Sequence, residues 1–460
     1  MTEPYEGFDL VVLGGGSAGY AAALRGAQLG LRTAMVEKYK LGGTCLHNGC
    51  IPTKALLHAG EIADRTRDAE LFGVRASFQS MDMASVQRYK EDTVAALCRG
   101  LTGLVKARNI TYIEGEGRLS SPTSVDVNGQ RIQGRHVLLA TGSVPKSLPG
   151  LDIDGDRIIS SDHALVLDRV PKSAIILGGG VIGVEFASAW KSFGADVTVI
   201  EGLKHLVPVE DENSSKLLER AFRKRGIKFN LGTFFQKAEY TQDGVKVTLA
   251  DGKEFEAEVL LVAIGRGPVS EGLGYEEAGV AMDRGFVTVD EYCRTSVPTI
   301  SAVGDLIPTL QLAHVGFAEG ILVAERLAGL NPVPVDYAGV PRVTYCNPEV
   351  ASVGLTEAKA AEKYGAENIT SYEYNLAGNA KSSILGTAGS VKAVRVNDGP
   401  VVGVHMIGAR VGELVGEAQL IVNWEAYPED VAPFVHGHPT QNETIGETML
   451  KLAGKPLHAI

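Results

Sequence analysis

Short apolar runs near the start of the chain predict two buried strands with a helix between them. Residues 9–13 form one such run, and residues 32–36 form a second that ends at Glu37. Between the runs lie a glycine-rich turn at residues 14–19 and an alanine-rich stretch of helical composition at residues 20–24. The pattern predicts a unit built as strand, turn, helix and strand.

The turn of this unit carries glycines spaced G-x-G-x-x-G, which is typical of dinucleotide-binding folds. Gly14 permits the tight turn, Gly16 lets backbone amides approach a pyrophosphate, and Gly19 allows the helix to pack closely on the strand. The helix N-terminus then holds the anion. A carboxylate at Glu37 suits the two hydroxyls of an adenosine ribose, so the unit is a candidate dinucleotide site.

The same arrangement recurs farther along the chain. A strand-like run precedes residues 178–183, and the next run ends at Glu201. The repeated glycines are Gly178, Gly180 and Gly183. In both copies 23 positions separate the first glycine from the terminal acid, Glu37 in one copy and Glu201 in the other. Two copies with matched offsets predict two Rossmann-like domains and two dinucleotides.

The acidic residue of the second copy indicates which nucleotide it binds. A carboxylate at Glu201 accepts hydrogen bonds from a free 2′-hydroxyl and repels a 2′-phosphate. The following residues, 203–205, supply no arginine for such a phosphate. We therefore predict NAD rather than NADP.

Composition limits the classes of partner. The chain has 460 residues and a net formal charge of −11, which argues against nucleic acid or an anionic membrane surface. No apolar run approaches the length of a transmembrane helix. The first ten residues contain neither the basic segment nor the apolar core of a signal peptide, so we expect a cytoplasmic protein.

Two of the five cysteines, Cys45 and Cys50, form the most informative pair in the sequence. An undistorted helix would place their Cα atoms about 8–9 Å apart, whereas a disulfide needs about 4.4–6.8 Å. Gly49 makes the required backbone distortion cheap. So short a loop would gain only about 2 kcal/mol from a disulfide, which favours a redox role over a structural one. A zinc site would need a second pair, and the other cysteines are scattered singly.

Two motifs and two turns carry a resemblance to a known family. The sequence GGTCLHNGCIPTK at residues 42–54 resembles the redox-disulfide signature of the flavoprotein disulfide reductases, in the form most similar to members that oxidise dihydrolipoamide. Residues 295–305 resemble the second FAD motif of that family, which includes Gly304 and in which Asp305 hydrogen-bonds the ribityl chain. Two turns are similar to those where the family's chain crosses between domains. They contain Thr141, Gly142 and Gly265, and Val269 stands where many relatives carry asparagine.

Alternating strands at residues 342–345 and 401–406 predict a different, α+β domain in the last part of the chain. Residues 434–443 resemble the family motif His-x-His-Pro-Thr-x-x-Glu, with Gln441-Asn442 where relatives often carry Leu-Ser or Ser-Ser. The resemblance makes His438 the acid/base and Glu443 its orienting carboxylate, whereas His436 is expected to be structural. In the family this histidine reaches the disulfide of the other subunit, which implies a homodimer.

The resemblance implies the following division and activity. The fold is α/β with two Rossmann-like domains and a C-terminal α+β interface domain. The expected parts are an FAD-binding domain at residues 1–148, an NAD-binding domain at 149–270, a central segment completing the FAD site at 271–340, and an interface domain at 341–460. The implied reaction oxidises dihydrolipoamide to lipoamide and reduces NAD⁺. The lipoyl group would come from an acyltransferase or carrier protein of a 2-oxoacid dehydrogenase or glycine cleavage complex.

Roles for individual residues follow from the same resemblance. Cys45 is attacked by the substrate thiolate, and Cys50 lies next to the flavin. Lys54 and Glu185 resemble an ion pair held near the flavin in relatives, where it tunes flavin electronics.

Other readings remain open at this point. The nearest is an NAD(P)H-dependent reductase of a small disulfide such as glutathione or mycothiol disulfide, against which Glu201 and the cysteine motif argue. The tail at residues 455–460 lacks the terminal cysteine pair of a mercuric reductase. A soluble transhydrogenase or quinone reductase would not need Cys45, Cys50 and His438 together. A structural subunit docked in a multienzyme complex is the alternative outside enzymes.

Overall fold

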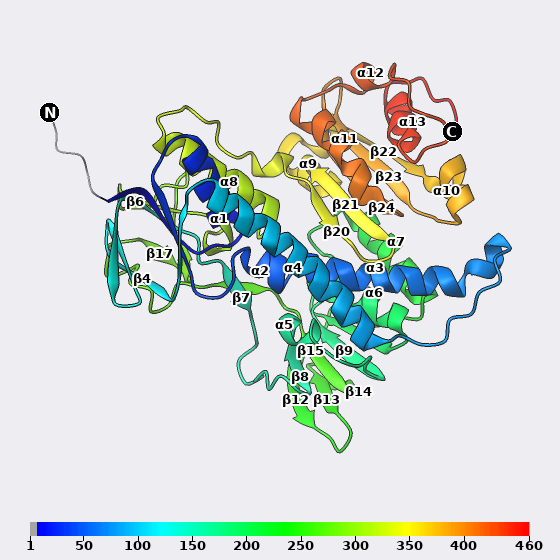
Figure 1. The fold of residues 1–460 in the computed structure, drawn as a ribbon. Coiled ribbons are helices and arrows are strands. Elements are labelled where there is room, and N and C mark those ends of the chain that lie inside the picture. The colour runs from blue at the N-terminus through cyan, green and yellow to red at the C-terminus, as the bar shows by residue number, and fades with distance from the viewer. Residues whose placement is uncertain (1–6, 460) are drawn as a thin grey trace. The chain divides into compact units, whose positions relative to one another are not determined.

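The computed structural model describes residues 7–459, which form two compact units (Figure 1). The first unit comprises the described residues up to Leu56, together with Asp82–Lys146 and Gly265–Tyr337. The second unit comprises Leu57–Met81, Ser147–Ile264 and the described residues from Ala338 onward. Neither unit is therefore one continuous stretch of chain. Residues 1–6, which enter the expectation that no signal peptide is present, lie outside the described residues.

A seven-stranded sheet forms the centre of the first unit. Its strands are β1 (Phe8–Leu13), β2 (Thr33–Glu37), β3 (Thr111–Glu114), β4 (Gly117–Ser121), β5 (Ser124–Val127), β6 (Gln130–Leu139) and β19 (Ile300–Ala302). The order is β3-β2-β1-β6-β5-β4, and β19 also pairs with β6. The pairings β3–β2, β2–β1, β1–β6 and β6–β19 are parallel. The pairings β6–β5 and β5–β4 are antiparallel. The apolar run predicted as the first strand is β1.

The last four residues of β1 are apolar and buried within the first unit. Leu10, Val11 and Val12 are completely buried, as expected for a parallel strand covered on both faces. The helices α1 (Ser17–Gln28) and α8 (Ala313–Leu327) lie side by side (Figure 1). A Cβ atom added at Gly320 of α8 would lie 2.3 Å from the carbonyl oxygen of Ala18. The two helices therefore meet backbone to backbone, and only glycine fits there.

The second unit contains a five-stranded parallel sheet. Its strands in spatial order are β11 (Lys228–Leu231), β10 (Asp196–Glu201), β9 (Ser173–Leu177), β15 (Val259–Val262) and β8 (Ile158–Ser160). A separate antiparallel sheet follows in the order β12 (Phe235–Tyr240), β13 (Val245–Leu249) and β14 (Glu254–Ala257). The helix α6 (Val181–Phe193) begins at the second glycine-rich turn.

The two parallel sheets have the same layout. The succession β3-β2-β1-β6-β19 in the first unit corresponds to β11-β10-β9-β15-β8 in the second. They differ in the origin of the last strand, because β19 comes late in the chain whereas β8 precedes the rest of its sheet. The prediction of two Rossmann-like domains is confirmed.

The C-terminal part of the second unit is an antiparallel sheet with helices. Its strands in spatial order are β20 (Arg342–Thr344), β21 (Glu349–Gly354), β24 (Val401–Gly408), β23 (Ser390–Val396) and β22 (Ile369–Asn375). Its helices are α9 (Glu357–Tyr364), α10 (Ala380–Leu385), α11 (Val411–Asn423), α12 (Pro428–Val431) and α13 (Glu443–Leu452). The helix α11 packs on β21 and β24, whose buried side chains form one core with Val411, Val415 and Ala418. The predicted α+β character of this region is confirmed.

The remaining elements connect these layers. The longer ones are α2 (Gly43–His47), α3 (Cys50–Arg67), α4 (Met83–Ala107), α5 (Ser161–Ala164) and α7 (Glu212–Lys224). The short ones are β7 (Ser143–Pro145), β16 (Arg266–Pro268), β17 (Met282–Asp283), β18 (Phe286–Val287), η1 (Ala69–Phe72), η2 (Gly304–Leu306), η3 (Tyr337–Gly339), η4 (Ala366–Asn368) and η5 (Leu376–Gly378).

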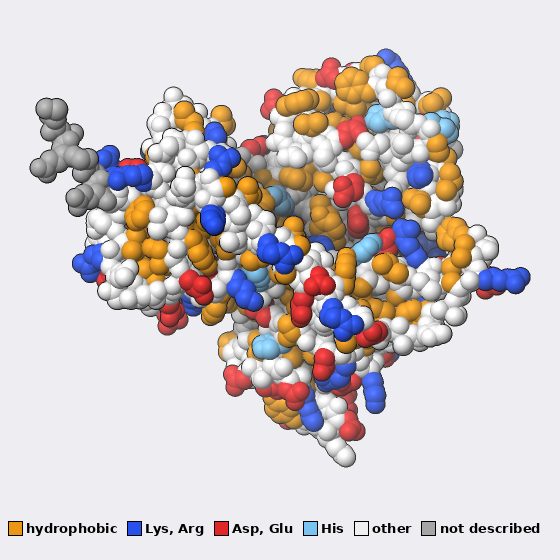
Figure 2. All heavy atoms as spheres, viewed as in Figure 1, with side chains coloured by type: hydrophobic (Ala, Val, Ile, Leu, Met, Phe, Trp, Pro, Cys, Tyr) orange, Lys and Arg blue, Asp and Glu red, His pale blue; other side chains and the backbone are white. Residues whose placement is uncertain are grey.

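Two surface properties bear on partners. None of the helices among residues 7–459 is both long and apolar enough to cross a membrane. Figure 2 shows acidic and basic side chains interspersed over the visible face.

Candidate active site and cofactor sites

The first glycine-rich turn connects β1 to α1 in a geometry that only glycine allows at two positions. Gly14 has a φ of +110°, and a Cβ atom added there would lie 2.2 Å from the carbonyl oxygen of Ala140. A Cβ atom at Gly19 would lie 1.9 Å from the carbonyl oxygen of Gly14. These contacts bring the turn, the next strand end and the first turn of α1 together.

The start of α1 is built to receive an anion. Gly16 caps the helix in an extended conformation, with φ −73° and ψ −173°, and no side chain caps the helix end. The first amide groups of a helix have no intrahelical partners, and their dipoles favour a negative charge. The amides that follow Gly16 can therefore hold the phosphates of a dinucleotide.

Glu37 is fixed next to this turn by two backbone amides. Its Oε2 accepts a hydrogen bond from the Gly15 N–H at 2.7 Å, and its Oε1 accepts one from the Tyr39 N–H at 2.8 Å. A carboxylate has about four acceptor sites, so two remain for ribose hydroxyls. The predicted ribose contact therefore fits the observed position of this side chain.

The second turn repeats this geometry closely. Gly178 also has a φ of +110°, and its added Cβ atom would lie 2.4 Å from the Ala263 carbonyl oxygen. A Cβ atom at Gly183 would lie 1.9 Å from the Gly178 carbonyl oxygen. Glu201 accepts hydrogen bonds from the amides of Gly179 at 2.6 Å and Leu203 at 2.8 Å. The two copies of the glycine motif therefore share their backbone contacts as well as their spacing.

The space at the second turn fits a dinucleotide. Gly180 caps α6 with φ −74° and ψ −173°, and a Cβ atom added there would meet no protein atom within 4 Å. This open space lies at the helix N-terminus, where a pyrophosphate binds in Rossmann folds. The residue His205, which follows Glu201 closely in sequence, is engaged with Glu219, its Nδ1 lying 3.0 Å from Oε1.

The second FAD motif of the first unit lies at η2. The Oδ2 atom of Asp305 accepts a hydrogen bond from the Ser143 hydroxyl at 2.5 Å, and the Ser143 Oγ accepts one from Arg266 Nε at 2.8 Å. The Gly304 amide donates to the completely buried Glu319 at 2.7 Å. Burial raises the pKa of the Glu319 carboxyl, although hydrogen bonds from Gly304 and other donors oppose the rise. Sequence reading gave no sign of Glu319, which belongs to no spaced motif, and it included Ser143 only as the last residue of a crossover turn.

The two crossover turns are joined within the first unit. Thr141 donates its hydroxyl to the carbonyl oxygen of Val269 at 2.6 Å, and the Val269 amide donates to the Gly142 carbonyl at 2.9 Å. Val269 takes part in these contacts only through its backbone carbonyl and N–H groups. A valine side chain in place of asparagine therefore leaves both hydrogen bonds intact. Gly142 and Gly265 have φ values of +71° and +119°, which favour glycine at both turns.

Cys45 and Cys50 lie on two helices separated by a break. Cys45 belongs to α2, which ends at His47, and Cys50 is the first residue of α3. A Cβ atom at Gly49 would lie 3.0 Å from the Thr44 carbonyl oxygen, so the break fits glycine best. The predicted backbone distortion is therefore present. Both cysteines are free thiols in this structure, and their side chains hydrogen-bond to each other.

The surroundings of Cys45 disfavour its thiolate. The hydrogen bond with Cys50 and burial raise the pKa of the Cys45 thiol, while the Ser17 hydroxyl and the charge of Lys54 oppose the rise. Burial, together with the two cysteines, also raises the pKa of the nearby Tyr20 to about 12. The Cys45 thiol and the Tyr20 hydroxyl are therefore protonated at neutral pH, and neither group can take up a further proton there.

His438 and Glu443 form a hydrogen-bonded pair at the start of α13. His438 Nδ1 lies 2.8 Å from Glu443 Oε1, and the Thr440 amide donates to Glu443 Oε2 at 2.7 Å. Burial would raise the pKa of the Glu443 carboxyl, but the Thr440 amide and His438 bring it below its ordinary value. The His438 side chain is 73 % exposed. The pair therefore presents Nε2 of an oriented imidazole to the surface.

The predicted ion pair between Lys54 and Glu185 joins residues of different units, so contacts within one unit do not test it. Lys54 belongs to the first unit and Glu185 to the second. Glu185 is buried on α6, and its Oε1 accepts a hydrogen bond from the Tyr345 amide at 2.9 Å. The pairing of Lys54 with Glu185 stays a prediction.

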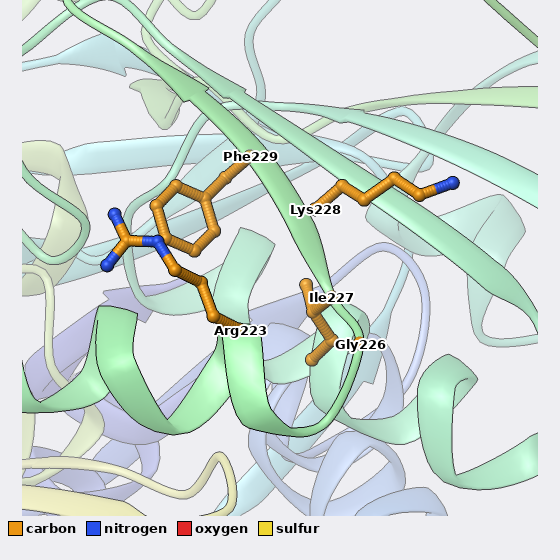
Figure 3. Close-up of a pocket in the computed structure, with 5 residues that line it drawn as sticks. All are labelled: Arg223, Gly226, Ile227, Lys228 and Phe229. Carbon is orange, nitrogen blue, oxygen red and sulfur yellow. The ribbon is translucent and has the colours of Figure 1, made fainter.

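A shallow hollow of about 390 Å³ lies elsewhere on the second unit (Figure 3). It is lined by Arg223, Gly226, Ile227, Lys228 and Phe229. The guanidinium of Arg223 stacks over the Phe229 ring at 4.5 Å from its centroid. The hollow lies where β11 begins, whereas Glu201 and the glycine turn lie where the parallel strands end. It is therefore at the opposite edge of the sheet from the predicted dinucleotide site.

Within residues 7–459, no group of three or more His, Cys, Asp and Glu side chains is placed to hold a metal ion.

Known proteins are similar to this chain along most of its length. Dihydrolipoyl dehydrogenase from Bacillus subtilis is 41% identical over 471 residues, which cover 98% of this chain and 99% of that protein. The mitochondrial dihydrolipoyl dehydrogenase of Schizosaccharomyces pombe is 40% identical over 98% of this chain and 91% of that protein. The crystal structure of LpdA from Mycobacterium tuberculosis aligns with a TM-score of 0.89 at 27% identity, over 96% of this chain and 99% of that one.

Two family matches account for the architecture. Residues 340–449 match the dimerisation domain of the pyridine nucleotide-disulphide oxidoreductases, so the chain forms a homodimer. Residues 8–320 match the family described as pyridine nucleotide-disulphide oxidoreductase. The chain therefore belongs to the pyridine nucleotide-disulphide oxidoreductase family, as an oxidoreductase that uses FAD and NAD.

Proposed function

We propose that the chain oxidises dihydrolipoamide to lipoamide and reduces NAD⁺ to NADH. The observation that carries the proposal is the exposed His438 held by Glu443 at 2.8 Å, because dithiol oxidation needs a base for the substrate thiols. Relatives named dihydrolipoyl dehydrogenase, 38–41% identical over nearly the whole chain, support this choice of dithiol. Glu201, fixed by two amides, favours NAD over NADP.

The residues of the chain divide the reaction as follows. Glu443 accepts the hydrogen bond from Nδ1 of His438, which leaves Nε2 to take the proton of a substrate thiol. The substrate thiolate attacks Sγ of Cys45, the Cys45–Cys50 bond breaks, and Cys50 leaves as a thiolate. The second substrate thiolate then attacks the substrate sulfur bound to Cys45, which closes the cyclic disulfide and releases Cys45.

The electrons end on NAD⁺. After the second attack the substrate has lost two electrons and two protons. The cysteine pair holds the electrons as the Cys45 thiol and the Cys50 thiolate, so one proton is on Cys45 and the other is on His438. Bound FAD supplies the relay that carries them to NAD⁺. We place FAD in the first unit, with Gly14, Gly16, Gly19, Glu37, Lys54, Thr141, Gly142, Gly304 and Asp305. We place NAD at Gly178, Gly180, Gly183, Glu185, Glu201 and Gly265, of which all but Gly265 belong to the second unit.

We further propose that each active site combines two subunits. His438 lies 393 positions after Cys45 in sequence, and the two residues belong to different compact units. In a homodimer, His438 of the partner subunit would serve the cysteines. The substrate would be a lipoyl group on an acyltransferase or carrier protein of a multienzyme complex. A reducing cytoplasmic location suits a cysteine pair that must cycle.

The test mixes two inactive variants, Cys45→Ser and His438→Gln, under conditions where subunits exchange. His438→Gln alone should lower the anaerobic reduction of NAD⁺ by dihydrolipoamide about a hundredfold, the usual scale of general-base catalysis. Half of the randomly exchanged dimers are mixed, and each restores one of two sites, so about a quarter of wild-type activity should return. The wild-type control compares dihydrolipoamide and NAD⁺ with NADPH and glutathione disulfide.

Two outcomes would count against these proposals. Faster turnover of NADPH with glutathione disulfide would assign a different substrate. No recovery in the mixture, despite proven exchange and full flavin content, would mean that the base acts within its own chain or is not His438.

A further inference from the structure

One carboxylate holds both ends of the loop that carries His438. Glu417 lies on α11, and its Oε1 is 2.8 Å from Nε2 of His436, just before His438. Its Oε2 accepts a hydrogen bond from Nδ2 of Asn442 at 2.5 Å, just before Glu443. The two residues that receive these contacts enclose the segment 437–441. Glu417 therefore joins the two ends of the loop. We call the group of Glu417, His436 and Asn442 the clasp.

The clasp is better shielded from water than the residue it surrounds. The side chains of His436 and Glu417 are 13 % and 25 % exposed, compared with 73 % for His438. The hydrogen bond to Glu417 raises the pKa of His436, against the opposing effect of burial. A protonated His436 ring would make this contact a charge-assisted hydrogen bond, the stronger kind.

The packing leaves little freedom for the His436 ring. A Cβ atom added at Gly446 of α13 would lie 2.7 Å from His436 Nδ1. The ring therefore rests directly on the backbone of α13, the helix that begins with Glu443. His436 links α11 to α13 across the loop, and a shift of its ring would move both partners of the His438–Glu443 pair.

Other contacts in the loop are local or reach one side only. The Thr440 hydroxyl donates to the Gly437 carbonyl at 2.7 Å, and Asn379 Nδ2 donates to the Thr440 carbonyl at 2.9 Å. These bonds shape the middle of the loop. The bonds of Glu417 are the ones that reach both ends.

We propose that Glu417 is a positioning residue for His438, acting through His436 and Asn442. The inference rests on the proposed function, in which His438 is the base. It assigns a role to His436, which sequence reading took as merely structural. It also gives a reason for Asn442, which stands where relatives often carry serine, because the longer amide reaches Glu417.

The test compares Glu417→Ala, Glu417→Gln and Asn442→Ala with a control, Glu413→Gln, in the FAD-loaded dimer. Glu413 is exposed one turn earlier on the same helix α11. Glu417→Ala should lower kcat for dihydrolipoamide at least tenfold. Transfer of electrons from NADH to an artificial acceptor should stay within twofold, because it needs no thiol base. Glu417→Gln, which keeps an acceptor and the side-chain length, should recover part of the loss, and Glu413→Gln should match wild type.

A second measurement follows the loop without turnover. Hydrogen exchange of the segment 437–441 should quicken in Glu417→Ala and in Asn442→Ala, while exchange in the β24 strand stays unchanged. Unchanged exchange in the loop, or dihydrolipoamide turnover within twofold of wild type in Glu417→Ala, would overturn the inference. A wild-type protein that does not oxidise dihydrolipoamide would instead refute the proposed function, and the exchange result would still report on the clasp.

Discussion

A methyl group at Gly180 should separate nucleotide binding from folding. The backbone there has φ −74° and ψ −173°, an extended conformation that any residue adopts, and a Cβ atom would meet no protein atom within 4 Å. Gly180→Ala should therefore leave the free energy of unfolding unchanged or raise it by about 0.4–1 kcal/mol, since alanine lowers the entropy of the unfolded chain. The open space it fills is the one that the pyrophosphate of NAD is expected to occupy.

The loss of NAD binding should be large by comparison. A methyl group in this space excludes the phosphate from the helix N-terminus, and we expect the affinity for NAD⁺ to fall at least tenfold, which is about 1.4 kcal/mol. Gly183→Ala provides the contrast. Its Cβ atom would lie 1.9 Å from the Gly178 carbonyl oxygen, so the turn must move. Overpacking of this kind typically costs about 1–3 kcal/mol of stability.

Calorimetric titration of the oxidised, FAD-loaded dimer with NAD⁺ measures the affinity, and thermal unfolding measures the stability. Gly180→Ala should retain its flavin, because we place FAD in the other unit. The matched variant in the first unit is Gly16→Ala, whose Cβ atom would lie 3.8 Å from the Gly43 Cα atom and which should bind FAD weakly. Wild-type NAD⁺ affinity in a folded Gly180→Ala protein would refute the placement of the pyrophosphate.

Two further predictions concern the cysteines and Glu201. The chain has five cysteines, so the oxidised protein should show three free thiols after denaturation and five after reduction; in Cys45→Ser the two counts should be equal, and unequal counts would place the disulfide elsewhere. Replacing Glu201 by Ala and Leu203 by Arg should shift the preference from NAD⁺ towards NADP⁺ by about 2–4 kcal/mol, because charged hydrogen bonds to the ribose are removed and the new arginine binds the 2′-phosphate. Steady-state kinetics with both nucleotides measures this shift, and an unchanged preference would show that Glu201 does not read the ribose.

The sequence was informative where a contact that demands one residue type occurs twice. Gly14 and Gly178 stand against carbonyl oxygens of the neighbouring strand end, and Glu37 and Glu201 each bind the amide of a turn glycine and an amide two residues away. Both copies keep the same spacing of 23 positions between the first glycine and the acid, so the repeat was visible in the sequence. The break between α2 and α3 at Gly49 was predictable because it depends on residues of one short segment.

Contacts between distant segments left no spacing to read. Glu417 meets His436 and Asn442 across 19 and 25 positions, and nothing in the pattern of α11 distinguishes it from an ordinary helical glutamate. Ser143 meets Asp305 across 162 positions. These partners are chosen by tertiary packing, which a single sequence does not reveal.

The late origin of β19 has a consequence for the order in which the chain can mature during synthesis. All five strands of the second parallel sheet lie between Ile158 and Val262, so that sheet is complete once this stretch has left the ribosome. The first sheet begins at Phe8, yet the edge of β6 pairs with its last strand only when Ile300–Ala302 emerge. The first sheet, whose strand β1 is synthesised earliest, is therefore the last of the two to be completed. Until β19 emerges, one edge of β6 stays unpaired.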